Sequence, residues 1–285
     1  MSTKPQISVI TPCYNHGKYI LEMLESLNNQ TFSNFEVIIV NDGSTDNTKE
    51  ILDKIKDNRV KIVHTPNRGP ATARNIAIGN ASADYILNLD ADDKIAPTLM
   101  EKAYNIITTD TNNNIGIVYC DAIYFGEREG RFELESYSIE KILNNNVIPS
   151  IALFRKIDWE RVGGYSNELK FSCEDWDFWL SIIETGRDVV HLEEPLLYYR
   201  TYKRLTKSRS GKLYVSSSKN AKTLITIFHR HKELYRQYPE IFNHYSNIER
   251  EYERENPVIR ILKDVYRYYL KNRSYKRCLN NRAHS

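Results

Sequence analysis

Short β-rich runs alternate with helical patterns along the first 120 residues of this 285-residue chain. The helical patterns repeat apolar residues every three or four positions, as Ile20, Met23, Leu24 and Leu27 do. This order is typical of βαβ units, in which helices flank a mainly parallel central sheet. We therefore predict an α/β fold with strands at residues 7–11, 35–41, 60–64, 85–90 and 115–120, and helices near 18–29, 45–56, 71–79 and 97–109.

Three of the predicted strands run directly into polar residues. The segments TPCYN (11–15), NDGSTD (41–46) and DADD (90–93) follow the first, second and fourth strands. Open α/β sheets bind their ligands at the carboxyl ends of the strands. We therefore expect these three turns to converge on one site.

The sequence changes character twice after residue 120. Residues 121–211 have a mixed pattern, which we expect to cover the sheet and bind a second substrate, so that residues 1–120 and 121–211 together form one catalytic domain, 1–211. Residues 212–285 predict a helical, basic C-terminal extension. Its last part, 257–285, carries eight basic residues and one acid, a net charge of +7, whereas the whole chain carries +3.

The basic tail also repeats apolar residues along one helical face. Such helices are attracted to anionic membrane surfaces, although packing on the catalytic domain or on a partner protein is an open alternative. The chain has no run of about 20 apolar residues and begins without the features of a secretory signal. We expect a cytoplasmic protein whose tail contacts the inner face of the membrane. We do not expect nucleic acid binding, because the charge is confined to the tail and no recognised motif accompanies it.

The segment LDADD, residues 89–93, is the strongest chemical signal. Two carboxylates at positions i and i+2 of a strand end can address a hard cation and a ribose hydroxyl together. A polar turn that caps the next helix is the structural alternative. Mg²⁺ and Mn²⁺ are the cations that we expect, because few carboxylates combined with substrate phosphates commonly hold them.

Four motifs in order resemble the family 2 glycosyltransferases, whose fold is called GT-A. They are ISVITPCYN (7–15), EVIIVNDGSTD (36–46), NRGPATARN (67–75) and LDADD (89–93). The resemblance implies a GT-A nucleotide-diphospho-sugar transferase fold and places the nucleotide across the first two strand ends. Pro12, Tyr14 and Asp42 would then contact the base and ribose. Asn41 stands where the family often has a second acid.

The same resemblance extends the donor site to the later motifs. It implies that Asp92 binds the metal. From the preference of Asp for helix N-caps, we expect Asp93 to cap the next helix. The NRGPATARN segment also reads as an ordinary turn and helix start. The remaining donor contacts that the resemblance implies are Asn67, Gly69, Arg74, Asp90 and Ala91.

A second motif lies in RVGGYSNEL (161–169) and CEDWDFWL (173–180). Family members carry a similar glycine turn followed by an acidic pair, and the resemblance implies that Asp175 is the catalytic base. A positioned carboxylate that takes the proton of an acceptor hydroxyl typically accelerates such a reaction by about 10²- to 10⁴-fold. Glu174 and Trp176 would contact the acceptor, whereas Trp179 belongs to the core, because the apolar pattern continues on either side of it.

Farther along, LLYYRTYKRLTKSRS (196–210) resembles the strand and basic loop that close over the donor in relatives. Arg200 and Lys207 would neutralise the leaving diphosphate. A solvated basic loop is an equally good interpretation.

The motifs together predict a metal-dependent, inverting transfer of a sugar from a nucleotide donor, with UDP as the expected nucleotide, to a hydroxyl of a glycan or lipid-linked glycan acceptor. A nicotinamide dehydrogenase would need GxGxxG after the first strand, and TPCYNHGKY lacks it. A nucleotidyltransferase would need a Gly-rich basic loop near that strand, which is also missing. A non-catalytic sugar-nucleotide-binding or scaffold subunit is the alternative that stays open.

Overall fold

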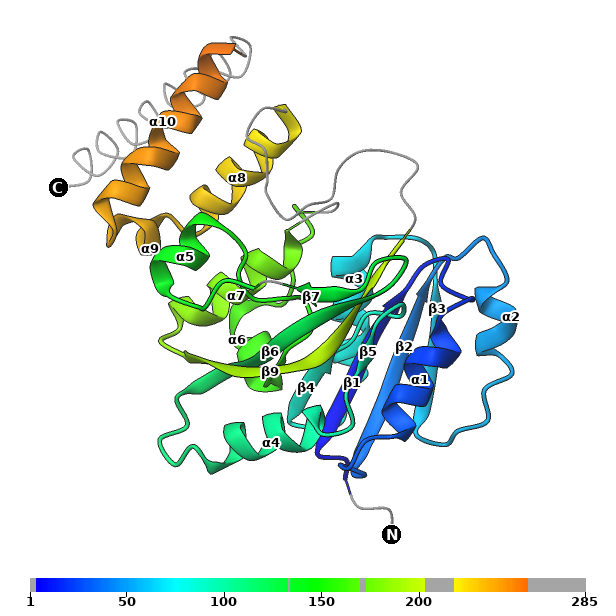
Figure 1. The fold of residues 1–285 in the computed structure, drawn as a ribbon. Coiled ribbons are helices and arrows are strands. Elements are labelled where there is room, and N and C mark those ends of the chain that lie inside the picture. The colour runs from blue at the N-terminus through cyan, green and yellow to red at the C-terminus, as the bar shows by residue number, and fades with distance from the viewer. Residues whose placement is uncertain (1–3, 133, 170–172, 203–217, 256–285) are drawn as a thin grey trace, which may run out of the picture. The chain divides into compact units, whose positions relative to one another are not determined.

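The computed structural model describes residues 4–132, 134–169, 173–202 and 218–255. The chain divides into two compact units, residues 1–210 and 211–285 (Figure 1). The site predicted from the sequence lies in the first unit, and the two units are described separately below.

One mixed sheet organises the described part of the first unit, in the order β3-β2-β1-β4-β8-β6-β9-β5, with β7 paired to β6. Strands β3, β2, β1 and β4 are parallel, as the alternating pattern predicts. The other half is mixed, since β8 runs antiparallel to both β4 and β6 while β9 runs parallel to β6. The strands are β1 (Ile7–Cys13), β2 (Phe35–Asp42), β3 (Val60–Thr65), β4 (Tyr85–Asn88), β5 (Lys94–Ile95), β6 (Ile115–Gly126), β7 (Gly130–Phe132), β8 (Leu153–Arg155) and β9 (Asp188–Thr201).

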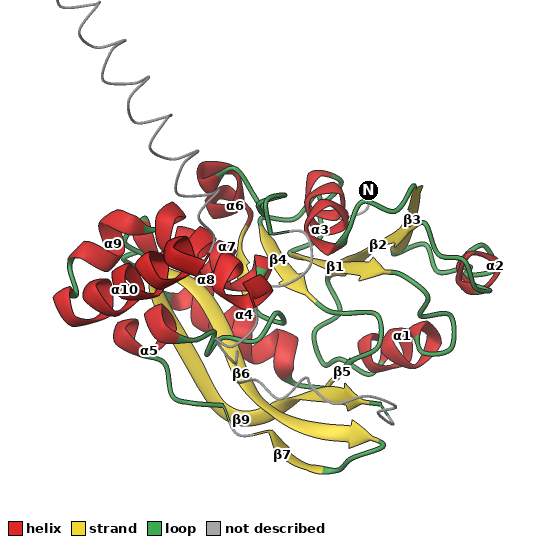
Figure 2. Ribbon diagram, turned by 90° about the horizontal axis from the view of Figure 1, so that it is seen from above, coloured by secondary structure: helices red, strands yellow, loops and turns green. Residues whose placement is uncertain are grey.

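Helices flank both faces of this sheet (Figure 2). They are α1 (Ile20–Asn28), α2 (Thr48–Leu52), α3 (Pro70–Gly79), α4 (Leu99–Thr109), α5 (Ile139–Asn144), α6 (Lys156–Val162) and α7 (Glu174–Glu184). Helix α3 lies on the opposite side of β1 and β2 from α1 (Figure 2). This layered arrangement agrees with the α/β fold expected from the sequence.

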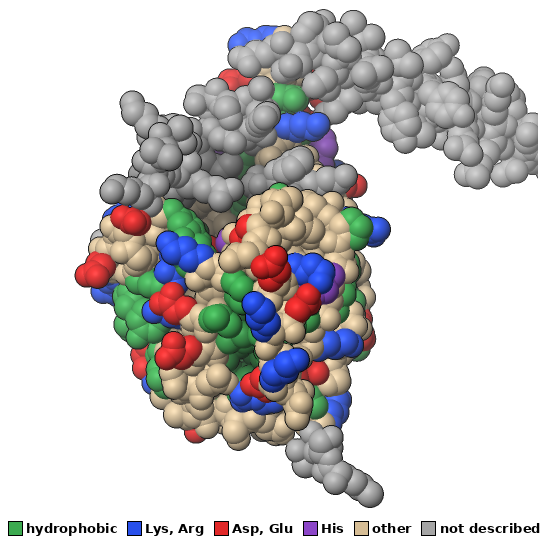
Figure 3. All heavy atoms as spheres, turned by 90° about the vertical axis from the view of Figure 1, so that its right-hand side faces the viewer, with side chains coloured by type: hydrophobic (Ala, Val, Ile, Leu, Met, Phe, Trp, Pro, Cys, Tyr) green, Lys and Arg blue, Asp and Glu red, His purple; other side chains and the backbone are tan. Residues whose placement is uncertain are grey.

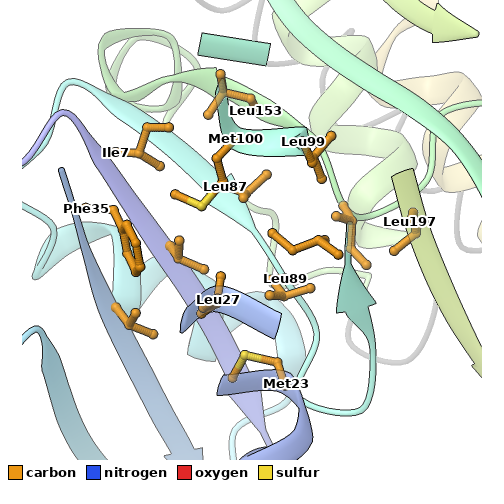
Figure 4. Packing of buried hydrophobic residues seen from close by; sticks show 14 of the residues in the cluster. Ile7, Met23, Leu27, Phe35, Leu87, Leu89, Leu99, Met100, Leu153 and Leu197 are labelled. Carbon is orange, nitrogen blue, oxygen red and sulfur yellow. The ribbon is translucent and has the colours of Figure 1, made fainter. Parts of the chain in front are cut away.

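The main hydrophobic core packs α1 and α4 against the sheet (Figure 4). Ile20, Met23 and Leu27 of α1 are fully buried because their three- and four-residue spacing puts them on one face of the helix. The strands of the parallel half are buried on both faces, which explains their nearly continuous apolar sequence. The core therefore holds the carboxyl ends of β1, β2 and β4 at one rigid edge.

The second unit is helical in its described part, with α8 (Ser218–Arg230), α9 (Lys232–Arg236) and α10 (Pro239–Glu255). Its helices pack through aromatic side chains, with Phe228 5.2 Å from Tyr235 and 5.3 Å from Phe242 between ring centroids. The basic tail at 257–285 lies outside the described residues. Within the described ranges, none of the helices combines the length and apolar character needed to cross a bilayer.

Charged side chains are mixed on the face of the molecule that Figure 3 shows. Lys and Arg side chains alternate there with Asp and Glu side chains, so the described residues of this face form no patch of a single sign. A shallow groove between α1 and β3 is lined partly by apolar side chains, including Leu21 and Ile55. It lies apart from the strand ends that carry the predicted site.

Candidate active site

Asn15 joins the turns that follow β1 and β2. Its backbone is in the left-handed region at φ 58°, a conformation that Asn tolerates better than most residues. Its side-chain Oδ1 accepts hydrogen bonds from the backbone N–H groups of Thr45 at 2.7 Å and Asp46 at 3.3 Å, and its own N–H donates to Ser44 Oγ at 2.9 Å. These bonds bring together two of the three turns that the sequence predicts to converge.

Asp42 anchors the loop that leads into α3. Its two carboxylate oxygens each accept a backbone N–H at 2.8 Å, one from Arg68 and one from Gly69. Gly69 needs its φ of 89°, which favours glycine, to turn the chain into the helix. Asp42 is 4% exposed. The carboxylate that the resemblance assigned to the nucleotide base is therefore already hydrogen-bonded within the protein. Contact of Asp42 with a base stays a prediction.

The other predicted base and ribose contacts lie around these turns. Tyr14 is 44% exposed, and Pro12 is partly buried. Asn67 is exposed beside Gly43, where an added Cβ would lie 2.5 Å from the Asn67 nitrogen. The missing side chain of Gly43 therefore lets the loops after β2 and β3 approach closely.

The LDADD turn follows β4 and separates its three acids by environment. Asp90 accepts hydrogen bonds from Arg74 Nη2 and Ser150 Oγ, both at 2.9 Å. Ala91 is buried. Asp93 is buried and accepts the backbone N–H of Arg200 at 2.7 Å, and burial, with the nearby charge of Asp92, raises its pKa well above the usual value.

Asp93 is not a helix cap, and the prediction that it caps the next helix is wrong. Helix α4 begins at Leu99 with Thr98 in the N-cap position, five residues beyond Asp93 along the chain. The Asp93 side chain turns inward instead, because the end of β9 presents a backbone donor to it. The structural role of Asp93 is to hold β9 against the LDADD turn.

Asp92 is partly accessible, with 19% of its side chain exposed, compared with 26% for Asp90. Its Oδ2 accepts a hydrogen bond from the Tyr202 hydroxyl and lies 4.0 Å from His16 Nε2. Tyr202 packs edge-on to Tyr19, with ring centroids 5.6 Å apart. Tyr202 lies within the segment 196–210 that resembles the loop over the donor, but the sequence did not identify it as a neighbour of the acid.

Arg200 is tied to the protein rather than free. Its guanidinium forms an ion pair with Glu22 and donates from Nε to the backbone carbonyl of Asp92 at 2.6 Å. The same group lies 4.4 Å from the ring centroid of Tyr19 and 4.2 Å from that of Phe125. Arg200 thus helps to fix the turn through Nε and Nη2, and its contact with the leaving diphosphate stays a prediction. Lys207 lies outside the described residues.

Asp175 lies in the first turn of α7. Cys173 precedes the helix with φ 66°, a left-handed conformation that is uncommon outside glycine. Asp175 Oδ2 accepts from Asn146 Nδ2 at 3.0 Å, and Oδ1 accepts from the Trp176 N–H at 2.9 Å. Burial raises the pKa of Asp175 to about 7, the charge of Glu174 adds to this effect, and Arg74 opposes it. A carboxyl with this pKa suits a general base at neutral pH.

Arg74 brings the two acidic motifs together. Its Nη2 donates to Asp90 at 2.9 Å, and its Nη1 donates to Glu174 at 2.6 Å across 100 positions of sequence. Asp90 of the LDADD turn and Glu174, the neighbour of Asp175, therefore bind the same guanidinium. The prediction that Arg74 binds the donor needs correction, because Arg74 is 4% exposed and acidic partners hold two of its guanidinium nitrogens.

The two tryptophans of α7 are both buried. Trp176 is 0% exposed and its Nε1 donates to the Ile142 carbonyl at 2.6 Å, so the prediction that it offers an open face to a sugar ring is wrong. Trp176 instead fixes α5 against α7. Trp179 packs with Phe154 and Phe178 in the core, as the apolar pattern predicts.

The donor set near Asp92 fits a hard cation that shares its ligands with a substrate. Within the described residues, no group of three or more His, Cys, Asp or Glu side chains is arranged to hold a metal ion by itself. Mg²⁺ and Mn²⁺ commonly bind one or two protein carboxylates and complete their shell with phosphate oxygens and water. Asp92 supplies such a carboxylate, since Asp90 is paired with Arg74 and Asp93 is buried.

The sequence matches a known family. Residues 8–160 match the model described as Glycosyl transferase family 2. Glycosyltransferase GlyG of Streptococcus pneumoniae is 33% identical over 191 residues, which cover 59% of this chain and 62% of the relative. Chondroitin synthase of Pasteurella multocida is 31% identical over 196 residues, which cover 64% of this chain and 19% of the relative. The chain thus spans less than two thirds of these relatives.

Solved structures share the fold. TarS residues 1–349 of S. aureus, solved in complex with UDP, superpose with a TM-score of 0.63 at 22% identity and cover 88% of this chain and 73% of that chain. Mannosyltransferase PcManGT of Pyrobaculum calidifontis, solved with GDP-Man and Mn²⁺, gives a TM-score of 0.55 at 18% identity and covers 87% of this chain and 74% of that chain. The fold predicted from the motifs is confirmed.

Proposed function

Because this chain belongs to glycosyl transferase family 2, we propose that it transfers a sugar, with inversion, from a nucleotide diphosphate donor to a hydroxyl of a glycan acceptor. The observation that carries this proposal is the Arg74 bridge, which puts Asp90 at one end of a single guanidinium and Glu174, the neighbour of Asp175, at the other. A base beside the acceptor and acids beside the donor are the parts that a direct displacement requires.

In the proposed reaction, an acceptor hydroxyl gives its proton to a carboxylate oxygen of Asp175. The hydroxyl oxygen forms a bond to the anomeric carbon from the side opposite the phosphate, so the configuration inverts. The bond between that carbon and the phosphate oxygen breaks, and the diphosphate leaves with the electron pair. Asn146 orients Asp175 by donating to its Oδ2 at 3.0 Å. No covalent enzyme intermediate is needed.

The donor is proposed to lie over the turns after β1, β2 and β4. Tyr14, Pro12 and Asn67 border this area, and Asp90 would accept from a ribose hydroxyl beside Ala91. A divalent cation, Mn²⁺ or Mg²⁺, would be held by Asp92 and would stabilise the charge of the departing diphosphate. The Mn²⁺ complex of the mannosyltransferase neighbour supports this assignment. The UDP complex of TarS favours UDP as the nucleotide.

The acceptor is proposed to be a growing cell-surface glycan, free or lipid-linked. This proposal draws on the similarity to chondroitin synthase and hyaluronan synthase of Pasteurella multocida. The basic segment 257–285 suits a protein that works at the inner face of a membrane, and this part of the proposal rests on its sequence alone.

The substitution Asp175→Asn tests the base. It should lower the release of UDP from a UDP-sugar in the presence of a glycan acceptor by about 10²-fold or more, while donor binding is retained. Asp84→Asn is the matched control, because Asp84 precedes β4 at the amino end of the strand and is 79% exposed. Equal turnover by the Asp175 variant would remove the base assignment. Donor binding without any UDP release by the native chain would instead favour a non-catalytic subunit.

A further inference from the structure

Helix α3 is fixed at its first turn and carries two polar side chains in its second. Asp42 holds the amide groups of Arg68 and Gly69, directly before the helix, at 2.8 Å each. Arg74 and Asn75 follow one turn later and face the second half of the domain. Because the start of α3 is anchored to β2, the positions of these two side chains are fixed relative to the sheet.

Arg74 grips the start of α7. Besides Glu174 and Asp90, its Nε approaches Asn88 Oδ1 at 3.3 Å, and its guanidinium carbon lies 5.6 Å from the ring centroid of Tyr165. Each carboxylate partner sits in an acidic motif of the proposed site. Arg74 therefore fixes Glu174, the residue immediately before Asp175, relative to the LDADD turn.

Asn75 grips the glycine turn that precedes α7. Its Oδ1 accepts from the indole Nε1 of Trp159 and from the Tyr165 N–H, both at 2.9 Å, and its Nδ2 donates to the Tyr165 carbonyl at 2.8 Å. An added Cβ on Gly164, whose φ is 78°, would lie 2.6 Å from Asn75 Oδ1. The tight fit explains why the turn carries glycine.

Both ends of the segment between these contacts are thus attached to α3. Asn75 holds Tyr165, Thr72 Oγ1 donates to Asn167 Oδ1 at 2.9 Å, and Arg74 holds Glu174. A helix that begins at the donor loop consequently determines where the base stands.

We propose that Arg74 and Asn75 are positioning residues. Held on the rigid helix α3, they determine the position of Asp175 relative to the donor at Asp90. The inference rests on the proposed role of Asp175 as the base. It assigns no ligand contact to Arg74 or Asn75. Changing either residue therefore misplaces the base but leaves the nucleotide contacts of the first two strand ends in place. A displacement of about 1 Å at a reacting group can cost about 10²-fold in rate.

The experiment compares Arg74→Lys and Asn75→Ala with two matched controls. Arg187→Lys alters another buried ion pair, since Arg187 Nη2 lies 2.7 Å from Asp158, and Asn80→Ala removes an amide that donates to the Ile76 carbonyl at the end of the same helix. Two properties are measured: the dissociation constant of UDP in the presence of Mn²⁺, by calorimetry, and kcat for UDP release from a UDP-sugar with a glycan acceptor.

We expect kcat to fall about 10²-fold in both α3 variants, with the UDP dissociation constant within about 3-fold of the native value. The two controls should keep kcat within about 2-fold. The double substitution Arg74→Met/Glu174→Gln removes both charges of the Arg74–Glu174 pair, while Asp90, 26% of whose side chain is exposed, loses Arg74 but keeps its hydrogen bond from Ser150 Oγ at 2.9 Å. It should therefore stay folded, which its melting temperature checks, and show the same loss of kcat.

Retention of kcat by Arg74→Lys and Asn75→Ala overturns the inference, and so does a loss of UDP affinity that parallels the loss of kcat. The Asp175→Asn variant is measured alongside. Full turnover by that variant refutes the proposed base, and the inference falls with it. Loss of turnover by Asp175→Asn, combined with full turnover by the α3 variants, refutes the inference alone.

Discussion

The substitution Glu174→Gln should move the acid limb of the pH–rate profile to lower pH. The general base must be deprotonated to act, and the pKa of Asp175 is about 7, raised by burial and then by the charge of Glu174. In the native chain, kcat/KM should therefore fall about tenfold for each pH unit below 7.

The size of the shift follows from the contacts of Glu174. Neutralising Glu174 removes a negative charge beside Asp175 and frees Arg74, 2.6 Å from Glu174 Oε1, to act more strongly on Asp175. Both changes favour the ionised form, and a neighbouring charge typically shifts a pKa by about one unit or more. With a shift of about one unit, the deprotonated fraction at pH 6 would rise from roughly 10% to about half.

The assay is kcat/KM for UDP release between pH 5 and 9, normalised to the plateau so that a general loss of rate does not enter. The control is Glu101→Gln, on the surface of α4, whose limb should stay in place. An acid limb of the native chain near the ordinary carboxyl value, or a limb that Glu174→Gln moves to higher pH, would refute the electrostatic reasoning.

Three further predictions concern the metal and the stability of the site. Tyr202→Phe removes the hydroxyl that donates to Asp92, so Mn²⁺–UDP should bind about tenfold more tightly in calorimetry, and unchanged or weaker binding would speak against competition for that carboxylate. Asp175→Asn should raise the melting temperature at pH 8. Because the pKa of Asp175 is raised in the folded state, the folded protein loses stability as pH rises from about 4 to 7, and Asn avoids this loss. A lower melting temperature would contradict the raised pKa. Gly164→Ala should lower the free energy of unfolding by about 1 to 3 kcal/mol and so lower the midpoint of urea unfolding, because the added Cβ would lie 2.6 Å from Asn75 Oδ1 and the φ of residue 164 is 78°. An unchanged midpoint would refute this tight fit.

The parallel half of the fold follows from local patterns. Continuous apolar runs separated by amphipathic helices predict β1 to β4 and their connecting helices, since burial on both faces demands such runs. The other half was less accessible, because β8 and β9 pair with β4 and β6 through contacts between distant parts of the chain. A two-residue strand such as β5 carries no periodicity at all.

The candidate site shows the same division. The acids after a predicted strand pointed to Asp90 and Asp92, the family resemblance pointed to Asp175, and the roles of all three stay predictions. The sequence did not reveal that Arg74 and Arg200 bind protein acids, since a guanidinium suits a phosphate and a carboxylate equally well. The partner of a polar side chain comes from folding, and it can lie 100 residues away, as Glu174 does from Arg74.

Several residues that hold the acids of the site were not predicted from the sequence. Asn146 and Ser150 each bond to an acid of the site but lie outside the quoted motifs, where single polar residues give no local signal. Tyr202, which bonds to Asp92, lies within 196–210, but that segment gave no sign of this partner. Asn15 had one available sign, because Asn is enriched in left-handed turns after strands.

The most direct test of the account is a crystal structure of the chain with UDP and Mn²⁺. We expect the nucleotide over the ends of β1, β2 and β4, the cation between Asp92 and the diphosphate, and the Asp175 carboxylate facing the open side of the β-phosphate. A nucleotide bound elsewhere, or a diphosphate beside Asp92 with Asp175 on a separate surface, would contradict the claim that both acidic motifs serve one reaction.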